Sequence, residues 1–195
     1  MKKRFHNQYY ILRHGQTIYQ AKKRKFAYHW PDKPPVRLTK KGEEQIKKIA
    51  KKLKDSKIGF IISSDVYRTR QAAGIVAKEL GLKVDFDERL RDINLGIYHG
   101  RRREEFYRDF SDPKRRFLQK PKKGESWNDV KKRLRDFLRE IERKYKNKKI
   151  LIVSHGDSLW LLEGIIEGFS NKELLKEISK GNYIKVGELR KLHAL

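Results

Sequence analysis

The sequence contains no cysteine. The protein can therefore form no disulfide, carry no thiol nucleophile and bind no metal through thiolates. Its six histidines are not paired at His-X-X-X-His spacing, and it has neither a P-loop nor a Gly-X-Gly-X-X-Gly stretch. These absences predict an enzyme or binding protein with no metal site and no cofactor.

Long hydrophobic runs are also missing, so we expect no segment that spans a bilayer. The basic start Met1-Lys2-Lys3-Arg4 is similar to the first part of a signal peptide. The apolar run behind it, Tyr9–Leu12, is too short to complete one. We therefore expect a soluble cytoplasmic protein with no membrane partner.

Acidic residues are scarce compared with basic ones. Lys and Arg total 50 against 25 Asp and Glu, which gives a net charge of +25. This charge would suit an anionic partner such as a phosphorylated substrate or a nucleic acid. It would equally suit a general excess of Lys and Arg on solvated faces, which we favour over nucleic-acid binding because the basic residues form no single stripe.

Short apolar runs recur along the chain, although hydrophobic residues make up only 37% of it. The runs Tyr9–Leu12, Gly59–Ile62 and Ile150–Val153 predict buried strands. Leu82–Phe86 is a weaker, alternating candidate, and Tyr183–Val186 predicts an edge strand.

Helical patterns lie between these runs. Thr39 is a candidate cap for a helix through Leu53, and Ser64 for one through Leu80. The apolar period from Trp127 to Tyr145 predicts the clearest helix, and a last apolar helix is expected from Ser158 to about Ile166. Strands that alternate with helices predict a single α/β domain over residues 1–195, with a mostly parallel sheet.

Two histidines follow predicted strands in the same way. Arg13-His14-Gly15 comes after the first strand, and Ser154-His155-Gly156 comes after the strand at 150–153. Ligand sites of open α/β sheets lie at the carboxyl ends of strands. The two histidines would therefore meet in one crevice if their strands are neighbours.

Arginines follow a third strand, at the start of a predicted helix. Arg68 and Arg70 lie in its first turns, where a helix N-terminus and guanidinium groups favour phosphate. A serine-hydrolase triad of Ser154, His155 and Asp157 is disfavoured, because nearly adjacent residues cannot reach triad geometry and no Gly-X-Ser-X-Gly elbow occurs.

The order of these segments resembles the histidine phosphatase (phosphoglycerate mutase-like) superfamily over nearly the whole chain. The segments that carry the resemblance are Arg13-His14-Gly15-Gln16-Thr17, Ser63 to Ala73, Leu90 to Gly100, Gly124-Glu125-Ser126 and Val153-Ser154-His155-Gly156. The resemblance implies a three-layer α/β/α sandwich. It also implies a metal-independent phosphatase of the family's short branch.

The resemblance assigns roles to individual residues. His14 would be the nucleophile that takes the phosphoryl group, in its neutral form and with its tautomer fixed by a backbone acceptor. His155 would donate a hydrogen bond to the phosphoryl oxygens, and Arg13 and Arg68 would neutralise them. The other implied phosphate-binding positions are Thr17, Gln20 and Gly156.

Two positions depart from the family's pattern. Gln20 stands where asparagine is usual. Asp92 stands where the family has a glutamate as the general acid, and aspartate is shorter and ordinarily more acidic. Asp92 would be the acid here, or the role would pass to Glu88 or weaken.

Residues 18–38 and 96–125 are irregular and contain all five prolines. Long loops of this kind are often functional. We expect residues 96–125 to form a basic cover over the site, either selecting multiply phosphorylated substrates or simply forming a solvated amphipathic face.

The sequence thus predicts a phosphomonoesterase that acts through a phosphohistidine on a small phosphorylated substrate. Two alternatives stay open. One is a phosphotransferase of the phosphoglycerate mutase type, and the other is a basic nucleic-acid-binding protein on an inactive phosphatase scaffold. The oligomeric state is not indicated by the sequence.

Overall fold

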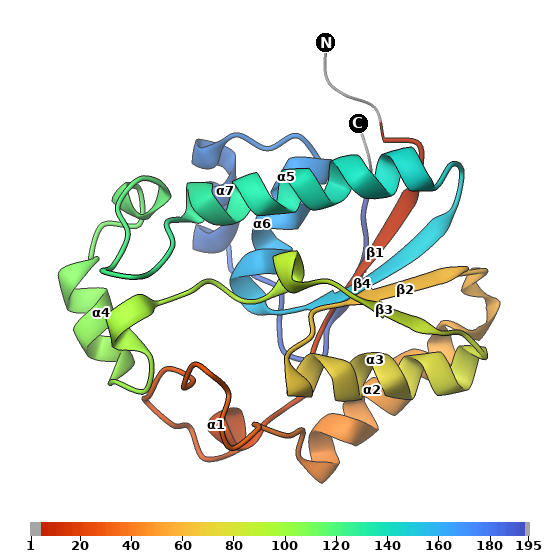
Figure 1. Cartoon of the computed structure of the whole chain (residues 1–195), viewed down its shortest axis with the longest axis horizontal. Helices are drawn as coiled ribbons and strands as arrows, with labels where there is room; N and C mark the ends of the chain where they lie inside the picture. Colours follow the sequence, from red (N-terminus) through yellow and green to blue (C-terminus); the bar gives the residue numbers. More distant parts are fainter. Residues whose placement is uncertain (1–4, 194–195) are drawn as a thin grey trace.

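A five-stranded sheet lies at the centre of the structure, a computed structural model that describes residues 5–193 (Figure 1). Its strands are β1 (Gln8–Arg13), β2 (Phe60–Ser63), β3 (Val84–Phe86), β4 (Lys149–Ser154) and β5 (Leu189–Lys191). The order across the sheet is β3-β2-β4-β1-β5. All neighbours are parallel except β5, which is antiparallel to β1.

The two central strands are apolar because both of their faces are covered. Tyr9 and Ile11 of β1 belong to the hydrophobic core on one side of the sheet, whereas Leu12 belongs to the core on the other side. Residues of β4 alternate in the same way, as the two-residue repeat of a strand requires. Continuous apolar runs are typical of such doubly covered parallel strands.

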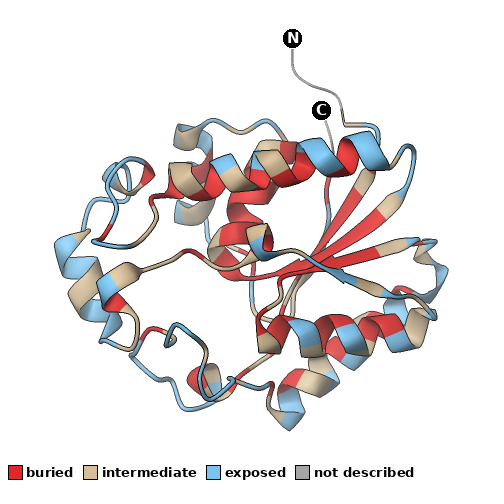
Figure 2. Cartoon of the chain, in the orientation of Figure 1, coloured by how far each residue is buried: buried red, intermediate tan, exposed pale blue. Residues whose placement is uncertain are grey.

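Helices cover both faces of the sheet (Figure 1). The core on one face includes buried residues of α2 (Lys40–Lys52) and α3 (Tyr67–Leu80). The core on the other face includes residues of α5 (Trp127–Lys144), α6 (Gly156–Ile166) and α7 (Asn171–Ser179). Figure 2 shows the buried side of each helix turned toward the sheet. The predicted three-layer α/β/α sandwich is confirmed.

Two predictions for single elements were wrong. Residues 183–186 form no strand, because their apolar pattern reflects packing of Ile184 into the core, and the edge strand is β5 instead. Ser64 does not cap α3, whose N-cap residue is Val66 without a side-chain cap. The helix expected near Ser158 is present and begins at Gly156, directly after the second histidine.

The two irregular stretches lie side by side beyond the sheet (Figure 1). The first contains the short helix α1 (Ile18–Ala21), and the second contains α4 (Arg103–Asp109) and the turns Gly96–Tyr98 and Arg115–Phe117. Backbone hydrogen bonds join them, with Ala27 N–H donating to Arg101 and Arg103 N–H to Lys25. Among residues 5–193, no helix combines the length and apolar character needed to cross a bilayer.

A buried carboxylate ties the start of β1 to α5. Glu142 accepts hydrogen bonds from the His6 backbone N–H (2.7 Å), the Asn7 side-chain amide (2.8 Å) and the Tyr9 hydroxyl (2.7 Å). Burial would raise the pKa of Glu142, but these hydrogen bonds outweigh it and hold the pKa below its usual value. The ionised carboxylate therefore stabilises the fold.

We predict that Glu142→Gln lowers the free energy of unfolding at neutral pH by about 1–3 kcal/mol, since it replaces a charge-assisted acceptor of several buried donors. The stabilisation by a carboxylate with a lowered pKa is present at neutral pH and is lost as the pH falls through that pKa. The difference in the free energy of unfolding between Glu142→Gln and the parent should therefore become smaller in acid. Urea unfolding at a series of pH values measures it.

Glu140→Gln on the same helix is the matched control. It breaks an exposed ion pair with Arg89, and exposed pairs contribute little to stability. Equal destabilisation by the two substitutions would contradict a special role for the buried carboxylate.

Candidate active site

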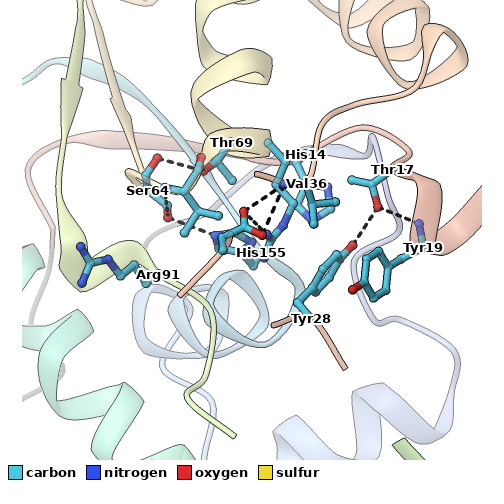
Figure 3. A network of polar contacts seen from close by, with 12 residues as sticks. His14, Thr17, Tyr19, Tyr28, Val36, Ser64, Thr69, Arg91 and His155 are labelled. Atoms are coloured by element: carbon cyan, nitrogen blue, oxygen red, sulfur yellow. Dashed lines mark hydrogen bonds and ion pairs between the residues drawn. The ribbon is translucent and has the colours of Figure 1, made fainter. Parts of the chain in front are cut away.

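The two histidines that follow β1 and β4 meet at one point. The parallel register pairs Arg13 with Ser154, and the His14 backbone N–H donates to the Ser154 carbonyl at 3.2 Å. The next residue of each strand is a histidine, and the His14 and His155 ring centroids lie 5.5 Å apart (Figure 3). Both rings are buried. The predicted convergence is observed.

The tautomer of His14 follows from its contact with the backbone. Its Nδ1 lies 2.8 Å from the Gly15 carbonyl oxygen, which can only accept, so Nδ1 carries the hydrogen. Burial lowers the pKa of His14 well below its usual value, and the charges of Arg68 and Arg13 lower it further. His14 is therefore neutral, and Nε2 has a free lone pair.

His155 has one partnered and one unpartnered nitrogen. Its Nε2 lies 3.0 Å from the Ser64 hydroxyl, which in turn accepts from the Val66 backbone N–H at 3.4 Å (Figure 3). Within residues 5–193 the Ser64 hydroxyl has no other acceptor for its hydrogen, so we assign that hydrogen to Nε2 and the ring hydrogen to Nδ1. Nδ1 is buried without a partner. Burial lowers the pKa of His155 well below its usual value, and the nearby charge of Arg68 lowers it further. The His155 ring is therefore neutral.

Two arginines flank the histidines. The Arg13 guanidinium donates to the Ile184 carbonyl at 2.8 Å and lies over the Tyr183 ring at 5.6 Å. Arg68 lies over the Tyr28 ring at 4.0 Å, and its ion pair with Asp32 is long, at 3.5 Å. The Nε atoms of both arginines are buried and have no hydrogen-bond partner.

Unsatisfied donors are therefore concentrated around His14. Across residues 5–193, four buried side-chain nitrogens lack a partner, and three of them belong to Arg13, Arg68 and His155. Buried polar groups are normally satisfied, and each exception calls for an explanation. Two guanidinium Nε–H groups and a ring N–H, each without an acceptor, are the arrangement expected for an anion site.

Thr17 and Gln20 do not line the cavity described below. Thr17 caps α1, and its backbone N–H and hydroxyl donate to the Gln20 side-chain carbonyl at 2.9 and 2.7 Å. The Thr17 and Gln20 side chains also contact the Tyr28 hydroxyl, at 3.0 and 2.8 Å. They hold Tyr28, the ring under Arg68, and their predicted phosphate contacts stay a prediction.

Gly156 is packed too tightly to carry a side chain. A Cβ atom built there would lie 2.3 Å from the Tyr183 hydroxyl and 3.1 Å from the Arg13 guanidinium carbon. The glycine thus lets the first turn of α6 approach Arg13, as expected for a backbone segment beside a ligand.

A cavity of about 910 Å³ opens above these groups. Arg13, His14, Arg68 and Gly156 line it from the sheet side. The two irregular stretches supply the opposite walls, so residues 96–125 do contribute to the cover. The cover residues that line the cavity include Tyr98, Arg102, Arg103, Phe106, Tyr107, Lys114 and Arg116.

Five carboxyl groups line the same cavity, those of Glu88, Asp92, Asp112, Glu125 and Asp157. Three of them form ion pairs, Glu88 with Arg91 at 3.0 Å, Asp112 with Arg115 at 3.7 Å and Glu125 with Arg133 at 2.8 Å. Asp92, the predicted acid, is half-buried, and its Oδ1 accepts from the Ile93 N–H at 3.1 Å. The sequence had suggested Asp157 only for a rejected triad, but this residue lines the cavity as well.

Other residues singled out by the sequence have structural roles. Arg70 is exposed and lies 4.2 Å from the centre of the Phe86 ring, so it turns away from the site. The Ser154 hydroxyl donates to the Leu90 carbonyl at 2.5 Å, not to a histidine. Within the described part of the chain, no three His, Asp or Glu side chains are grouped as ligands for a metal ion.

Sequence patterns gave no signal that Tyr28 and Tyr183 would lie beneath the site arginines. Each lies in an irregular stretch or between elements, where no periodic pattern marks it. The helices α4 and α7 were missed as well. A Ser170-to-Glu173 capping box was visible as a signal for α7.

Comparison with known proteins agrees with this geometry. Residues 9–184 match the sequence pattern of the Histidine phosphatase superfamily (branch 1). A probable phosphoglycerate mutase of Escherichia coli is 32% identical over 166 residues, which are 83% of this chain and 75% of the relative.

Solved structures share the fold. The mycobacterial glucosyl-3-phosphoglycerate phosphatase superimposes with a TM-score of 0.71 at 25% identity, over 88% of this chain and 84% of that one. The alpha-ribazole phosphatase from Shigella flexneri gives 0.76 at 20% identity, over 96% of this chain and 95% of that one. The chain, with both histidines inside its matched region, belongs to branch 1 of the histidine phosphatase superfamily.

Proposed function

We propose that the protein is a phosphomonoesterase that works without a metal ion, through a phosphohistidine on His14. One observation carries the proposal. A neutral histidine with a free Nε2 lies among three buried donors, on Arg13, Arg68 and His155, that lack acceptors. A phosphoryl group would give these donors their acceptors and place phosphorus beside the nucleophile.

The site supplies positive charge where the reaction develops negative charge. Phosphoryl transfer spreads charge over three equatorial oxygens, and preplaced donors stabilise it. Arg13 and Arg68 would each contact these oxygens, and the N–H of His155 Nδ1 would donate to them. Gly156 begins α6, whose N-terminal backbone N–H groups and dipole also favour an anion.

The chemistry would proceed in two displacements. In the first, Nε2 of His14 attacks phosphorus, the N–P bond forms and the bond to the leaving oxygen breaks. The positive charge that develops on the imidazole is stabilised by the hydrogen bond from Nδ1 to the Gly15 carbonyl. In the second, a water attacks phosphorus, the N–P bond breaks and inorganic phosphate leaves. The leaving oxygen needs a proton, and the resemblance assigns that role to Asp92.

The cavity supports a small substrate with a bulky leaving group. Its volume of about 910 Å³ exceeds what a phosphoryl group alone would fill, and aromatic and basic side chains form its outer walls. Two relatives with the same fold are named as phosphatases for glucosyl-3-phosphoglycerate and alpha-ribazole, and the first was solved with VO3 and with inorganic phosphate. These names favour a phosphorylated metabolite as substrate.

A mutase-type phosphotransferase is the second candidate, because the relative that is 32% identical is a probable phosphoglycerate mutase. A mutase returns the phosphoryl group to substrate, whereas a phosphatase transfers it to water. Incubation with each phosphoglycerate isomer, followed by measurement of both isomers and of free phosphate, separates the two. Isomer exchange faster than phosphate release would favour the mutase.

We predict that His14→Ala abolishes phosphate release from p-nitrophenyl phosphate and from a panel of phosphorylated metabolites, and that EDTA leaves the parent's activity unchanged. The substitution removes the nucleophile, and no metal takes part. During turnover of the parent, mass spectrometry under non-acidic conditions should find one phosphoryl group on the peptide that contains His14.

His193→Ala is the matched control, since His193 is exposed and does not line the cavity. It should retain full activity. Activity that EDTA removes, or a phosphoryl group on any other residue, would overturn the proposed mechanism.

Phosphate binding provides a test that does not depend on turnover. Inorganic phosphate at about 100 times its dissociation constant should stabilise the parent by about 2.7 kcal/mol, which thermal unfolding detects as a higher Tm. Arg68→Ala should lose most of this shift, since it removes one of the two guanidinium groups. An exposed arginine, Arg70, supplies the control Arg70→Ala, which should keep the shift. An unchanged shift in Arg68→Ala would place the anion elsewhere.

A further inference from the structure

Asp157 is a carboxyl group of the cavity that the proposed reaction has not used. It is the second residue of α6 and follows Gly156, which lies close to Tyr183 and Arg13. Asp92 lines the same cavity from the segment after the Glu88–Leu90 turn. The other three carboxyl groups of the lining, on Glu88, Asp112 and Glu125, are in ion pairs. Asp92 and Asp157 have none within the described residues, so these two face the cavity beside His14 without a cationic partner.

The surroundings of Asp157 come from four parts of the chain. Arg13 at the end of β1 and Tyr183 before β5 lie against each other, 5.6 Å from guanidinium carbon to ring centre. A Cβ built on Gly156 would lie 2.3 Å from the Tyr183 hydroxyl and 3.1 Å from the Arg13 guanidinium carbon, so both side chains lie close to the first turn of α6. Arg116 from the cover and Asp92 complete the charged groups that act on Asp157.

These groups push the Asp157 carboxyl toward its protonated form. Burial raises the pKa of Asp157 to about 6, and repulsion by the Asp92 carboxylate adds to this effect. Arg13, Arg116 and a hydrogen bond with Tyr183 oppose it without reversing it. A bound phosphoryl group brings further negative charge, which favours the protonated form still more. An acid is most effective when its pKa lies near the working pH.

We propose, on the basis of the phosphatase function above, that Asp157 is the proton donor to the leaving oxygen and that Asp92 assists it as a neighbouring carboxylate. Carboxyl pairs whose environments differ divide their roles in this way, one staying ionised while the other carries the proton. The division also accounts for the short side chain at Asp92. A carboxylate that acts by repulsion does not need the reach of a glutamate.

The Asp157 carboxyl group would give up its proton in the first displacement and regain one in the second. As His14 Nε2 forms its bond to phosphorus, the electron pair of the breaking P–O bond moves to the leaving oxygen. That oxygen takes the proton of Asp157 and departs as an alcohol, which leaves Asp157 ionised. In the second displacement Asp157 accepts a proton from the attacking water, and inorganic phosphate leaves as the N–P bond breaks. The donor is then restored for the next cycle.

The experiment compares Asp157→Asn with Asp92→Asn across a pH series. The substrates are an alkyl phosphate, β-glycerol phosphate, whose leaving group needs a proton, and p-nitrophenyl phosphate, whose leaving group needs it much less. The parent's kcat for the alkyl phosphate should fall as the pH rises, because the donor loses its proton.

Asp157→Asn should lower kcat for the alkyl phosphate by about 100-fold or more and remove this decline with pH. Its loss on p-nitrophenyl phosphate should be much smaller. Asp92→Asn should keep the decline but move it to lower pH, because the repulsion that favours protonated Asp157 is gone. Asp157→Glu, which retains a carboxyl group, should restore the decline.

The reversed pattern would overturn the inference. If Asp92→Asn removes the decline and Asp157→Asn only moves it, Asp92 is the donor. Equal losses on both substrates in Asp157→Asn would also exclude a donor role. Asp55→Asn, at an exposed position outside the cavity, is the control and should match the parent. A parent that releases phosphate from no substrate would overturn the proposed function itself, which separates the two failures.

Discussion

The parallel pairing of β1 with β4 is the constraint on which the rest of the site depends. Its register sets Arg13 beside Ser154, so that each strand ends one residue before a histidine. The two chain segments are more than a hundred residues apart in sequence, yet neither ring needs a long side chain or a flexible loop to reach the other. A shift of one residue in this register would turn alternate side chains to the opposite face and separate the histidines from the buried donors around them. The apolar runs on both faces of these strands specify the register, and the core therefore positions both histidines.

The sequence predicted the fold and the centre of the site for the same reason. Apolar runs, helical periods and residues that directly follow strands are local signals, and β1, β4, α5, His14 and His155 all carry them. The signals failed where tertiary contacts decide the structure. Residues 183–186 look like a strand because Ile184 is buried and Tyr183 lies beside Gly156. Their backbone pairs with no strand, and the Ile184 carbonyl accepts a hydrogen bond from Arg13 instead. Ser64 looks like a helix cap, but its hydroxyl is used by His155. Neither contact leaves any trace in the local pattern.

The two arginines beside His14 act both on its protonation state and on the charge of the site. Burial makes a protonated His14 unfavourable, and the charges of Arg68 and Arg13 add to this, so the ring is neutral before any ligand arrives. The charges that keep the ring neutral are those that would hold the phosphoryl oxygens. A phosphate that binds would cancel part of their field at His14 just when positive charge begins to develop on the ring. The site would thus favour a neutral His14 before phosphate binds and tolerate positive charge on the ring afterwards.

A few arginines of this protein, whose net charge is +25, have no close ion pair and so remain available for a ligand. Arg89 and Arg91 line the cavity but are committed to carboxylates at 2.5 to 3.0 Å. Arg13 and Arg116 have no ion pair within the described residues, and Arg68 has only a long one. Each of these three lies over an aromatic ring, on Tyr183, Tyr107 and Tyr28 respectively. A ring holds a guanidinium by its face and leaves the N–H donors around the edge unneutralised, whereas a carboxylate occupies them. Arg89 and Arg91 also lie over rings, on Phe137 and Trp30, so the missing close ion pair, and not the ring, distinguishes the three arginines that remain available for a ligand.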